Sequence, residues 1–544
     1  MPPQFWIDAV SKAVLDRENR LKRGLEILRV ECGIGASGFP HIGSVGDAIR
    51  AYGVKLGLDA LGTKSELIAY SDDRDGLRKV PIGVPRDYEK YLGIPVTDIP
   101  DPWKCHSSYG EHMSQLLLEA LEMLELEFTF ISGTQAYKSG LLDESIDILL
   151  RNHQKVDQII REEVGSSKPP GWVYYWPVCE NCGRIYTTRV TKVLPEEGKV
   201  LYVCDQDFKN VKGCGFRGEA SYRKGIGKLA WMGGEFAARW AALRITFEPH
   251  GKDITDSFRV NARICKEILK FDPPLTIVYE MFLDRTGSKI SKSKGNVITP
   301  QQWLRYSPAE VLRMIMFKRY RGTRAISLEM IATYINELEE KIAQYHNLDA
   351  IKDPRRRINI KRLVEYSYLL REVPEPKDYK FGTILNVISL LPFKQMDEQS
   401  LLRHVSDIIG KYYEITPDEL HLDNWFVQLF RCALNYLNEI VPYMHVEVPS
   451  LDPQTLDAIE RFLISINQDM SAEEIQSLAF SIARESSVSI RNFFSTLYFL
   501  LLGRFSGPKL GPLIHRLGVE TSKSLILSAI EKVKRGHGER SGKN

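Results

Sequence analysis

Apolar runs and amphipathic segments alternate over the first hundred residues. The run EILRVECGIG (26–35) has the length and β-branched content of a buried strand, and SELIAYSDD (65–73) is a second such run. Between them, ASGFPHIGS forms a glycine-rich turn and VGDAIRAYGVKLGLDALG has helical periodicity. The order strand, glycine turn, helix, strand is typical of the first unit of a doubly wound, parallel α/β nucleotide-binding domain.

The alternation is interrupted once and resumes before the chain becomes helical. We predict the first half of the nucleotide-binding domain in residues 1–101, an insertion of helices and cysteine-bearing strands in 102–223, and the second half in 224–300. Two all-α regions follow, a connecting region at 301–351 and a C-terminal domain at 352–544. Within the latter, KDPRRRINIKR (352–362) is predicted as a linker, because a proline and basic residues interrupt the helical pattern.

Composition and charge narrow the class of protein. With 43% hydrophobic and 26% charged residues, the chain has the make-up of an ordinary globular protein. Its longest apolar run, 493–502, is much shorter than the roughly 20 residues that cross a bilayer, and its first residues lack the pattern of a secretory signal. We therefore expect a cytoplasmic protein without a membrane partner. A net charge of +3 argues against histone-like DNA binding but leaves room for local basic surfaces.

Four of the eight cysteines are grouped within the expected insertion. They are a CxxC pair and two further cysteines at wider spacing: Cys179, Cys182, Cys204 and Cys214. This grouping predicts a structural Zn²⁺ site of four thiolates, with Asp205 or Asp207 as alternatives to one sulfur. The remaining cysteines are scattered, and we predict that they are buried apolar residues: Cys32, Cys105, Cys265 and Cys432.

Two short segments contain residue types that bind a triphosphate. In GASGFPHIGS (35–44), small residues let the backbone approach phosphates, the following helix offers unpaired N–H groups, and His41 can donate to a phosphate oxygen. In KISKSKGN (289–296), two lysines three residues apart stand on a predicted loop that can fold over the phosphates. The residues expected to contact ATP are Ala36, Ser37, Gly38, Pro40, His41, Gly43, Lys289, Ser291, Lys292 and Ser293. Alone, each segment also fits a simpler structure, a glycine turn before a helix or a solvated basic turn.

Together the two segments resemble the paired signature motifs of class I aminoacyl-tRNA synthetases. The sequence departs from the family pattern at Ser44, where the first motif ends in histidine, and at Ile290, where the second has methionine. The GKD segment at Gly251–Asp253 then falls where the family contacts the ATP ribose through Gly251 and Asp253, although a surface turn is an equal alternative. The resemblance implies activation of an amino acid with ATP and Mg²⁺, and it implies four catalytic residues: His41, Ser44, Lys289 and Lys292.

Further segments are similar to class I lysyl-tRNA synthetases in particular. They extend from residue 5 to about residue 517 and include SDDRDGLRKVP, WMGGEFAARWAAL, FEPHGKDITDS and LLGRFSGPKLGPLI. The resemblance implies L-lysine and tRNA(Lys) as substrates and a helical C-terminal domain that reads the anticodon. Candidates for contact with the tRNA backbone are Arg355, Arg356, Arg357, Lys361 and Arg362. We expect a monomer.

A bound lysine side chain needs a carboxylate partner, because a desolvated and unpaired ammonium costs free energy. Four acids are candidates for this partner: Glu31, Asp72, Asp73 and Glu235. Gly33 lies beside Glu31, and three aromatic side chains can line the methylene stem or face the cation: Trp231, Trp240 and Tyr279. Asp72 and Asp73 also fit a turn cap or an ion pair with Arg74 or Arg78.

Two other functions remain open. A glutamyl-type class I synthetase also has a helical C-terminal half, but its substrate needs a cation where Glu31, Asp72 and Asp73 place acids. A synthetase-like paralogue that binds RNA or nucleotide without charging tRNA is the second, although a pure binding module has no use for a phosphate loop such as KISKSKGN. Amino-acid-dependent pyrophosphate exchange distinguishes these functions.

Overall fold

The computed structural model describes residues 4–280, 282–283, 298–322, 324–440, 452–486, 488–502 and 509–541. The chain divides into two compact units. Unit 1 comprises Met1–Leu304, Leu312–Ser327 and Asn347–Val373, and unit 2 comprises Arg305–Val311, Leu328–His346 and Pro374–Asn544. Among the described residues, no helix combines the length and the apolar composition needed to span a bilayer.

Unit 1 is organised around a parallel sheet with the strand order β3-β2-β1-β9. Its strands are β1 (Leu28–Ile34), β2 (Ser65–Ser71), β3 (Thr129–Ser132) and β9 (Ile245–Phe247). Beyond β9, two short strands pair in parallel, β10 (His250–Gly251) and β11 (Val278–Tyr279). The predicted doubly wound α/β domain is confirmed, and the predicted strand, turn, helix and second strand occur where the hydrophobic pattern put them.

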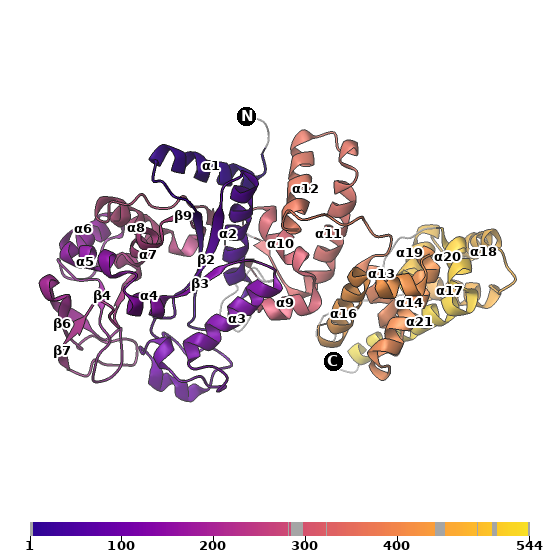
Figure 1. Ribbon diagram of the computed structural model, residues 1–544. Coiled ribbons are helices and arrows are strands. Elements are labelled where there is room, and N and C mark those ends of the chain that lie inside the picture. The colour runs from indigo at the N-terminus through magenta and orange to yellow at the C-terminus, as the bar shows by residue number, and fades with distance from the viewer. Residues whose placement is uncertain are drawn as a thin grey trace. The chain divides into compact units, whose positions relative to one another are not determined.

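Helices cover the two faces of this sheet (Figure 1). Successive residues of a strand point to opposite faces, and Ile68 and Tyr70 of β2 share one hydrophobic core with Trp240 of α7 (Glu235–Leu243). Helix α2 (Ile42–Ala60) contacts β1 and β2 from the other face. The sheet edge at which the strands end is therefore flanked by α2 on one side and α7 on the other.

Helix α1 (Trp6–Leu21) packs closely along α2. The hydroxyl of Ser11 donates to the carbonyl oxygen of Val54 at 3.1 Å, and a Cβ added at Gly57 would lie 2.2 Å from the Oγ of Ser11. Glycine at position 57 is therefore required by this helix crossing, which holds α2 against the sheet.

The region predicted as an insertion contains four helices, an antiparallel sheet of order β5-β6-β7 and the strand β3 of the main sheet. Its elements, with the strand that follows, are α3 (Tyr109–Met123), α4 (Gly133–Ser139), α5 (Asp143–Arg151), α6 (His153–Val164), β4 (Tyr175–Trp176), β5 (Arg189–Leu194), β6 (Lys199–Val203), β7 (Arg217–Ser221) and β8 (Lys228–Leu229). After β9 come α8 (Thr255–Glu267), β12 (Phe282–Leu283), α9 (Pro300–Tyr306), α10 (Ala309–Lys318) and β13 (Arg324–Ala325).

The linker predicted at 352–362 is wrong, because these residues begin helix α12 (Pro354–Ser367). Asp353 caps the helix by accepting a hydrogen bond from the backbone N of Arg355 at 2.9 Å, and the proline occupies the first turn, where its missing N–H costs nothing. Arg362 pairs with Asp8 of α1 at 2.6 Å and with Glu365 at 2.6 Å. Arg362 is thus a structural residue, whereas Arg355, Arg356 and Lys361 are exposed.

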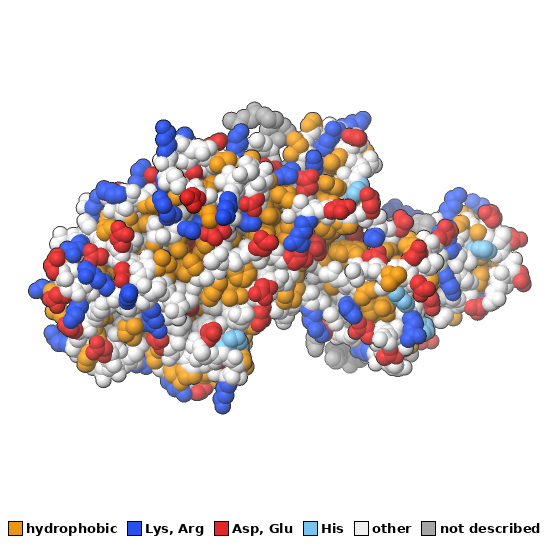
Figure 2. Space-filling model, in the orientation of Figure 1, with side chains coloured by type: hydrophobic (Ala, Val, Ile, Leu, Met, Phe, Trp, Pro, Cys, Tyr) orange, Lys and Arg blue, Asp and Glu red, His pale blue; other side chains and the backbone are white. Residues whose placement is uncertain are grey.

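The described part of unit 2 is helical, as predicted for the C-terminal half. Its helices are α11 (Ile331–Tyr345), α13 (Phe381–Leu390), α14 (Glu398–Tyr413), α15 (Pro417–Leu422), α16 (Asn424–Glu439), α17 (Pro453–Ser465), α18 (Ala472–Glu485), α19 (Ile490–Leu502), α20 (Leu510–Leu517) and α21 (Val519–Ser541). Helices α17 to α21 share a hydrophobic core that includes the fully buried side chains of Phe462, Phe493 and Ile514. Over the visible face, positive and negative side chains are interspersed (Figure 2), as the small net charge leads one to expect.

Candidate active site

The order of the parallel strands reverses next to β1, with β2 and β3 on one side and β9 on the other. In doubly wound sheets, ligands bind at this switch point, outside the carboxyl ends of the strands. The glycine-rich segment 35–41 leaves β1 at this edge, and the segment 248–253 leaves β9 there. Two of the predicted ATP-binding segments are therefore brought to one edge of the sheet.

His41 caps the helix that follows the glycine turn. Its Nδ1 accepts a hydrogen bond from the backbone N of Ser44 at 3.3 Å. A Cβ at Gly43 would lie 2.7 Å from the Cε1 of His41, so this ring position requires glycine. Because Nδ1 is an acceptor, the proton of a neutral His41 lies on Nε2, which makes Nε2 the donor atom of the ring.

The segment KISKSKGN lies outside the described residues, and with it Lys289, Ser291, Lys292 and Ser293. The chain is described again from Ile298, two positions after that segment. The carbonyl oxygen of Ile298 accepts a hydrogen bond at 3.1 Å from the backbone N of Ile42, the first residue of α2. Ile298, which follows the second signature segment in the sequence, therefore lies beside the helix start of the first.

Gly251 and Asp253 lie close to the same edge. Gly251 belongs to β10 and is paired with Tyr279 of β11, and Asp253 lies in the single helical turn that follows. The guanidinium of Arg50, from α2, stands over the ring of Tyr279 at 4.4 Å. This contact ties β11 to the helix that His41 caps.

A buried arginine on α7 holds three carboxylates together. The guanidinium of Arg239 lies 2.5 Å from Glu31, 3.2 Å from Asp72 and 2.8 Å from Glu248. Glu31 stands on β1 and is fully buried, and Asp72 follows β2. Burial raises the pKa of Glu31, Asp72 and Glu248, and the positive charge of Arg239 opposes that rise.

A second buried cation lies close to the first cluster. Lys228 has no exposed side-chain surface, and its Nζ lies 2.5 Å from Asp75 and 2.7 Å from Glu235. Lys228 and Asp72 also attract each other electrostatically, which joins the two clusters. Burial raises the pKa of Glu235 to about 8, against the opposing charge of Lys228 and with support from the negative charges of Asp72 and Asp75.

Together, these clusters contain more carboxylates than cations. The five buried carboxylates are Glu31, Asp72, Asp75, Glu235 and Glu248, and the two fully buried cations are Arg239 and Lys228. Arg78 also pairs with Asp75 at 3.1 Å, but its side chain is 44% exposed. Negative charges crowded at low dielectric repel one another. A cationic ligand would lower this repulsion, whereas an anionic ligand would add to it.

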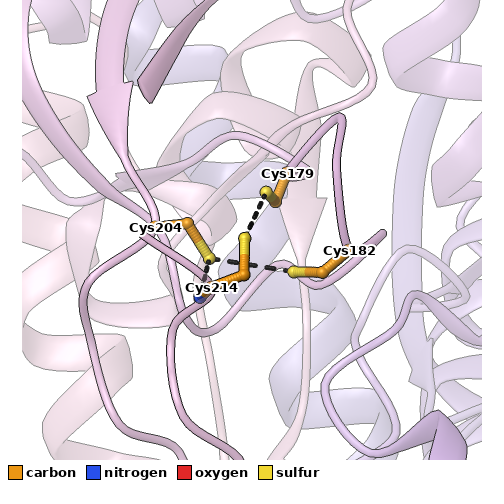
Figure 3. Close-up of side chains that lie close together, drawn as sticks. All are labelled: Cys179, Cys182, Cys204 and Cys214. Atoms are coloured by element: carbon orange, nitrogen blue, oxygen red, sulfur yellow. Dashed lines mark hydrogen bonds between the residues drawn. The ribbon is translucent and has the colours of Figure 1, made fainter. Parts of the chain in front are cut away.

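The four grouped cysteines converge in the antiparallel region (Figure 3). The Sγ atoms of Cys179 and Cys214 are 3.6 Å apart and those of Cys182 and Cys204 are 3.8 Å apart. Four thiolates at zinc–sulfur distances of about 2.3 Å around a tetrahedral ion lie about 3.8 Å from one another. The four sulfurs therefore fit Zn²⁺, while Asp205, an alternative ligand in the sequence, pairs with Arg189 instead.

Comparison with known proteins identifies the family. The family model described as tRNA synthetases class I (K) matches residues 4–368. A lysine–tRNA ligase of Cenarchaeum symbiosum (strain A) is 38% identical over 524 residues, covering 96% of this chain and 98% of that protein. A lysine–tRNA ligase of Rickettsia felis is 30% identical over 541 residues, covering 96% and 98%. The chain belongs to the class I tRNA synthetases of the lysine type.

The resemblance to class I lysyl-tRNA synthetases, inferred from the sequence motifs, is thereby confirmed. A solved glutamate-tRNA synthetase from Elizabethkingia anophelis is 14% identical, covers 93% of this chain and 99% of that chain, and superposes with a TM-score of 0.40. That likeness is too slight to bear on the substrate.

Some predicted lysine-binding residues of the synthetase already have structural partners. Asp73 accepts hydrogen bonds from the Oγ of Ser132 at 2.5 Å and the backbone N of Thr134 at 2.7 Å, and so holds the first turn of α4, whose N-cap is Ser132. Trp240 is buried in the core, where its N–H donates to Glu248. These contacts favour the structural alternative for Asp73, and they place the Trp240 indole beside the charged cluster.

Trp231 and Gly33 lie at the borders of the charged clusters. The ring of Trp231 is half-buried, and the guanidinium of Arg78 stands over it at 4.7 Å. A Cβ at Gly33 would lie 3.8 Å from the Nη2 of Arg239, so this residue is next to the buried arginine. Trp231 thus borders a cation that pairs with Asp75, and Gly33 borders the arginine that pairs with Glu31.

Sequence reasoning missed the cations Lys228 and Arg239 and the acids Asp75 and Glu248. All four are buried, and each either pairs with a predicted acid or shares a cation with one. A signal was present for one of them, since Arg239 is the single charged residue in the run FAARWAAL, and a lone charge on an apolar helix needs a buried partner.

The prediction for the scattered cysteines is correct for three of them and wrong for one. Cys32, Cys265 and Cys432 are buried, but Cys105 is exposed. The sulfur of Cys105 lies 3.2 Å from the Nδ1 of His106 and 3.2 Å from the Nδ1 of His112. The prediction failed because Cys105 lies at the surface among polar side chains, and the spacing of a single cysteine does not reveal such surroundings.

Proposed function

We propose that this synthetase is a lysine–tRNA ligase that joins L-lysine and ATP into lysyl-adenylate with release of diphosphate. It then transfers the lysyl group to tRNA(Lys) with release of AMP. The observation that carries the proposal is the buried surplus of carboxylates around Arg239 and Lys228, next to β1 at the switch point of the sheet. A glutamate side chain would add another negative charge to this region, which disfavours the glutamyl alternative.

The protein contributes to adenylate formation by positioning the substrates and by neutralising the charge of the phosphates. The lysine carboxylate attacks the α-phosphate in line, and no general base is needed for that step. We assign the phosphates to the backbone of the glycine turn, to Nε2–H of His41 and to Mg²⁺, and the ribose to Gly251 and Asp253. The turn residues are Ala36, Ser37, Gly38, Pro40 and Gly43, with Ser44 behind them at the start of α2.

The proposed lysine pocket uses the acids of the two clusters. Glu31, Asp72 and Glu235 are the carboxylates we assign to the substrate ammonium groups, and Trp231 and Tyr279 are the aromatic rings we assign to the methylene stem. Each of these acids pairs with Lys228 or Arg239, but those two cations serve five carboxylates. The ammonium of a bound lysine supplies a further positive charge to this network.

Pyrophosphate exchange tests the function directly. The purified chain is supplied with ATP, labelled diphosphate and each amino acid in turn, and label should enter ATP with lysine alone. Exchange with glutamate would identify the glutamyl alternative, and no exchange with any amino acid, with or without unfractionated tRNA, would favour the non-charging paralogue.

We expect Glu31→Gln to raise the lysine KM by roughly 10- to 100-fold, since a hydrogen bond to a charged group contributes about 1.5–3 kcal/mol. The measurement is lysine-dependent pyrophosphate exchange. Asp73→Asn is the matched control, because this buried carboxylate at the same edge already serves α4 and should leave the lysine KM unchanged. If Glu31→Gln lowers only the melting temperature, then Glu31 serves Arg239 and not the substrate.

Lys292→Ala is expected to slow adenylate formation by on the order of 10²-fold while leaving lysine binding intact, because this lysine stabilises the departing diphosphate. Single-turnover kinetics and equilibrium lysine binding measure the two effects. Lys294→Ala removes the same charge from the same segment outside the signature positions and is the control. Equal loss in both variants would mean that the segment contributes only general positive charge.

For the cysteine cluster we propose a structural Zn²⁺, held by Cys179, Cys182, Cys204 and Cys214. Four filled positions leave no site for a substrate, so the ion stabilises the β5-β6-β7 region and takes no part in the reaction. We expect Cys182→Ser to expose 170–223 to limited proteolysis before the remainder of unit 1 is cut, with mass spectrometry identifying the first cleavage sites. First cleavage elsewhere in unit 1 would contradict this role.

We further propose that residues 352–544 read the anticodon and that the enzyme is a monomer. Arg355, Arg356 and Lys361 are exposed on α12 and remain our candidates for the tRNA backbone. Light scattering of the purified chain and footprinting on tRNA(Lys) address the two points separately.

A further inference from the structure

Three aromatic side chains of unit 2 gather at the surface of its helices. Phe480 lies on α18, and Phe494 and Tyr498 lie one helical turn apart on α19. The ring centroids of Phe480 and Phe494 are 4.7 Å apart, and those of Phe494 and Tyr498 are 6.5 Å apart. We call these three residues the aromatic face. Nothing in the reaction proposed above uses them.

The aromatic face is open to solvent. Phe480 is 37% exposed, and Phe494 and Tyr498 contact the core of α17 to α21 while remaining partly exposed. Ile490, one turn before Phe494 on α19 and 38% exposed, extends the same surface. Single apolar side chains at a surface are ordinary, but a contiguous patch indicates that something binds there.

Two arginines flank the aromatic face on the same two helices. Arg484 follows Phe480 by one turn on α18, and Arg491 precedes Phe494 by one turn on α19, so each arginine lies beside a ring. Both side chains are exposed, and neither forms an ion pair within the part of the chain that the structure describes. Their charges are therefore available to a ligand.

The acid next to Arg484 does not neutralise it. Glu485 pairs instead with Arg461 of α17 at 3.4 Å. On α18, Ser477 and Ser481 are also exposed on the turns around Phe480. Positive charge and hydroxyl groups thus border the aromatic face, and both suit a ligand that carries phosphates.

Aromatic rings beside unpaired arginines are the two elements of a surface for single-stranded nucleic acid. Unpaired bases stack on aromatic rings whatever their sequence, and arginines contact the phosphates between them. A partner protein would account for the exposed rings but not for the two unpaired cations beside them. The bases of a paired RNA stem are hidden, so the ligand that fits is a loop.

We propose that the aromatic face stacks unpaired bases of the tRNA loop, with Arg484 and Arg491 on the neighbouring phosphates. This inference rests on the proposed function of residues 352–544 in reading the anticodon, and it names residues of that domain that contact the loop. Because stacking is tolerant of sequence, the face contributes affinity for the loop rather than the choice among anticodons.

Binding of an anticodon stem-loop of tRNA(Lys) to the full-length chain tests the face. Phe480→Ala should weaken binding about 5- to 150-fold, since one base stacked on an aromatic ring contributes about 1–3 kcal/mol. Phe480→Trp keeps a ring and should bind as tightly as the unmodified chain. Leu422→Ala removes an exposed apolar side chain of α15 and is the control. Circular dichroism confirms folding, and Phe494→Leu replaces Phe480→Ala if the latter misfolds.

A stem-loop whose loop nucleotides lack their bases separates stacking from other contacts. This RNA keeps the phosphates of the loop but has nothing to stack, so the unmodified chain and Phe480→Ala should bind it equally. If Phe480→Ala weakens binding of this RNA as much as that of the intact stem-loop, or weakens neither, the aromatic face does not stack bases.

The salt dependence of binding tests the two arginines. Each phosphate contact to a single strand contributes about 0.7 to the slope of log K against log salt. Arg484→Gln and Arg491→Gln should each reduce that slope by about 0.7, whereas Phe480→Ala should leave it unchanged. Arg431→Gln is the control, because the charge of Arg431 is already paired with Glu398 at 2.9 Å. An unchanged slope in both variants would remove the arginines from the RNA surface.

Aminoacylation separates this inference from the ligase function on which it rests. Phe480→Ala should raise the KM for tRNA(Lys) by a factor similar to its loss of stem-loop binding. Lysine-dependent pyrophosphate exchange by the unmodified chain, with an unchanged tRNA KM in Phe480→Ala, would overturn the aromatic face while the ligase function stands. A dimeric unmodified chain that becomes monomeric in Phe480→Ala, measured by light scattering, would assign the face to a second copy and also overturn it.

Discussion

Replacing His41 with alanine should slow adenylate formation by on the order of 10²- to 10³-fold, the loss observed when one positioned donor to a developing negative charge is removed. In the structure, Nδ1 of His41 accepts from the backbone N of Ser44, so Nε2 carries the proton and donates. Single-turnover formation of lysyl-adenylate is the measurement, because it isolates the chemical step from tRNA charging and product release.

The same side chain also caps α2, so the catalytic and structural losses must be separated. Asparagine is among the best N-cap residues and keeps a side-chain oxygen for the N–H of Ser44 but lacks the distal donor. We expect His41→Asn to restore the melting temperature of the unmodified chain while remaining as slow as His41→Ala. A variant that recovers both stability and rate would show that His41 acts only as a cap.

The architecture of the nucleotide-binding domain could be predicted because it is encoded locally. The apolar run of β1, the glycines at 35, 38 and 43 and the helical pattern of α2 each specify a conformation within a few residues. The error at 352–362 was also local, since Pro354 was interpreted as a helix breaker although proline is favoured in a first turn that Asp353 caps.

The partners of the charged residues could not be predicted in the same way. Glu31 and Arg239 are more than 200 positions apart in the sequence, and only the sheet and α7 bring them to 2.5 Å. The chemical need for an acid near a lysine ammonium suggested Glu31, Asp72 and Glu235, but not the two cations that hold them. Pairing across a fold depends on packing, which periodicity does not contain.

The cysteines show that a site is found from the sequence only where the spacing of its residues is a recognised pattern. The CxxC pair at Cys179 has a recognisable spacing, so the grouped cysteines were found. Cys105 has no partner cysteine at a recognisable spacing, and it was consequently taken for an apolar residue. In the structure the backbone N atoms of Cys105 and His106 donate to Asp101, and the loop held in this way brings the Cys105 sulfur to the rings of His106 and His112.

Arg239→Met should be the most damaging change to stability. It leaves Glu31, Asp72 and Glu248 buried without their common cation, and removing one partner of a buried ion pair costs about 3–5 kcal/mol. The midpoint of thermal unfolding measures this loss. Arg244→Met is the matched control, because Arg244 is exposed at the end of the same helix and its replacement should change stability by no more than about 0.5 kcal/mol.

The pH dependence of the stability of the Arg239→Met variant shows whether the lost positive charge causes its destabilisation. Without the arginine, the pKa values of the three buried carboxylates rise further in the folded state, while in the unfolded chain they stay near about 4. The folded state then binds more protons, so its stability is greatest at low pH and is lost as pH rises toward the folded-state pKa values. The deficit relative to the unmodified chain should therefore be larger near pH 8 than near about pH 5.5, and adding Glu31→Gln should recover part of it. A deficit independent of pH, with no recovery in the double variant, would mean that Arg239 stabilises α7 through packing on Tyr70 and Phe236 rather than through charge.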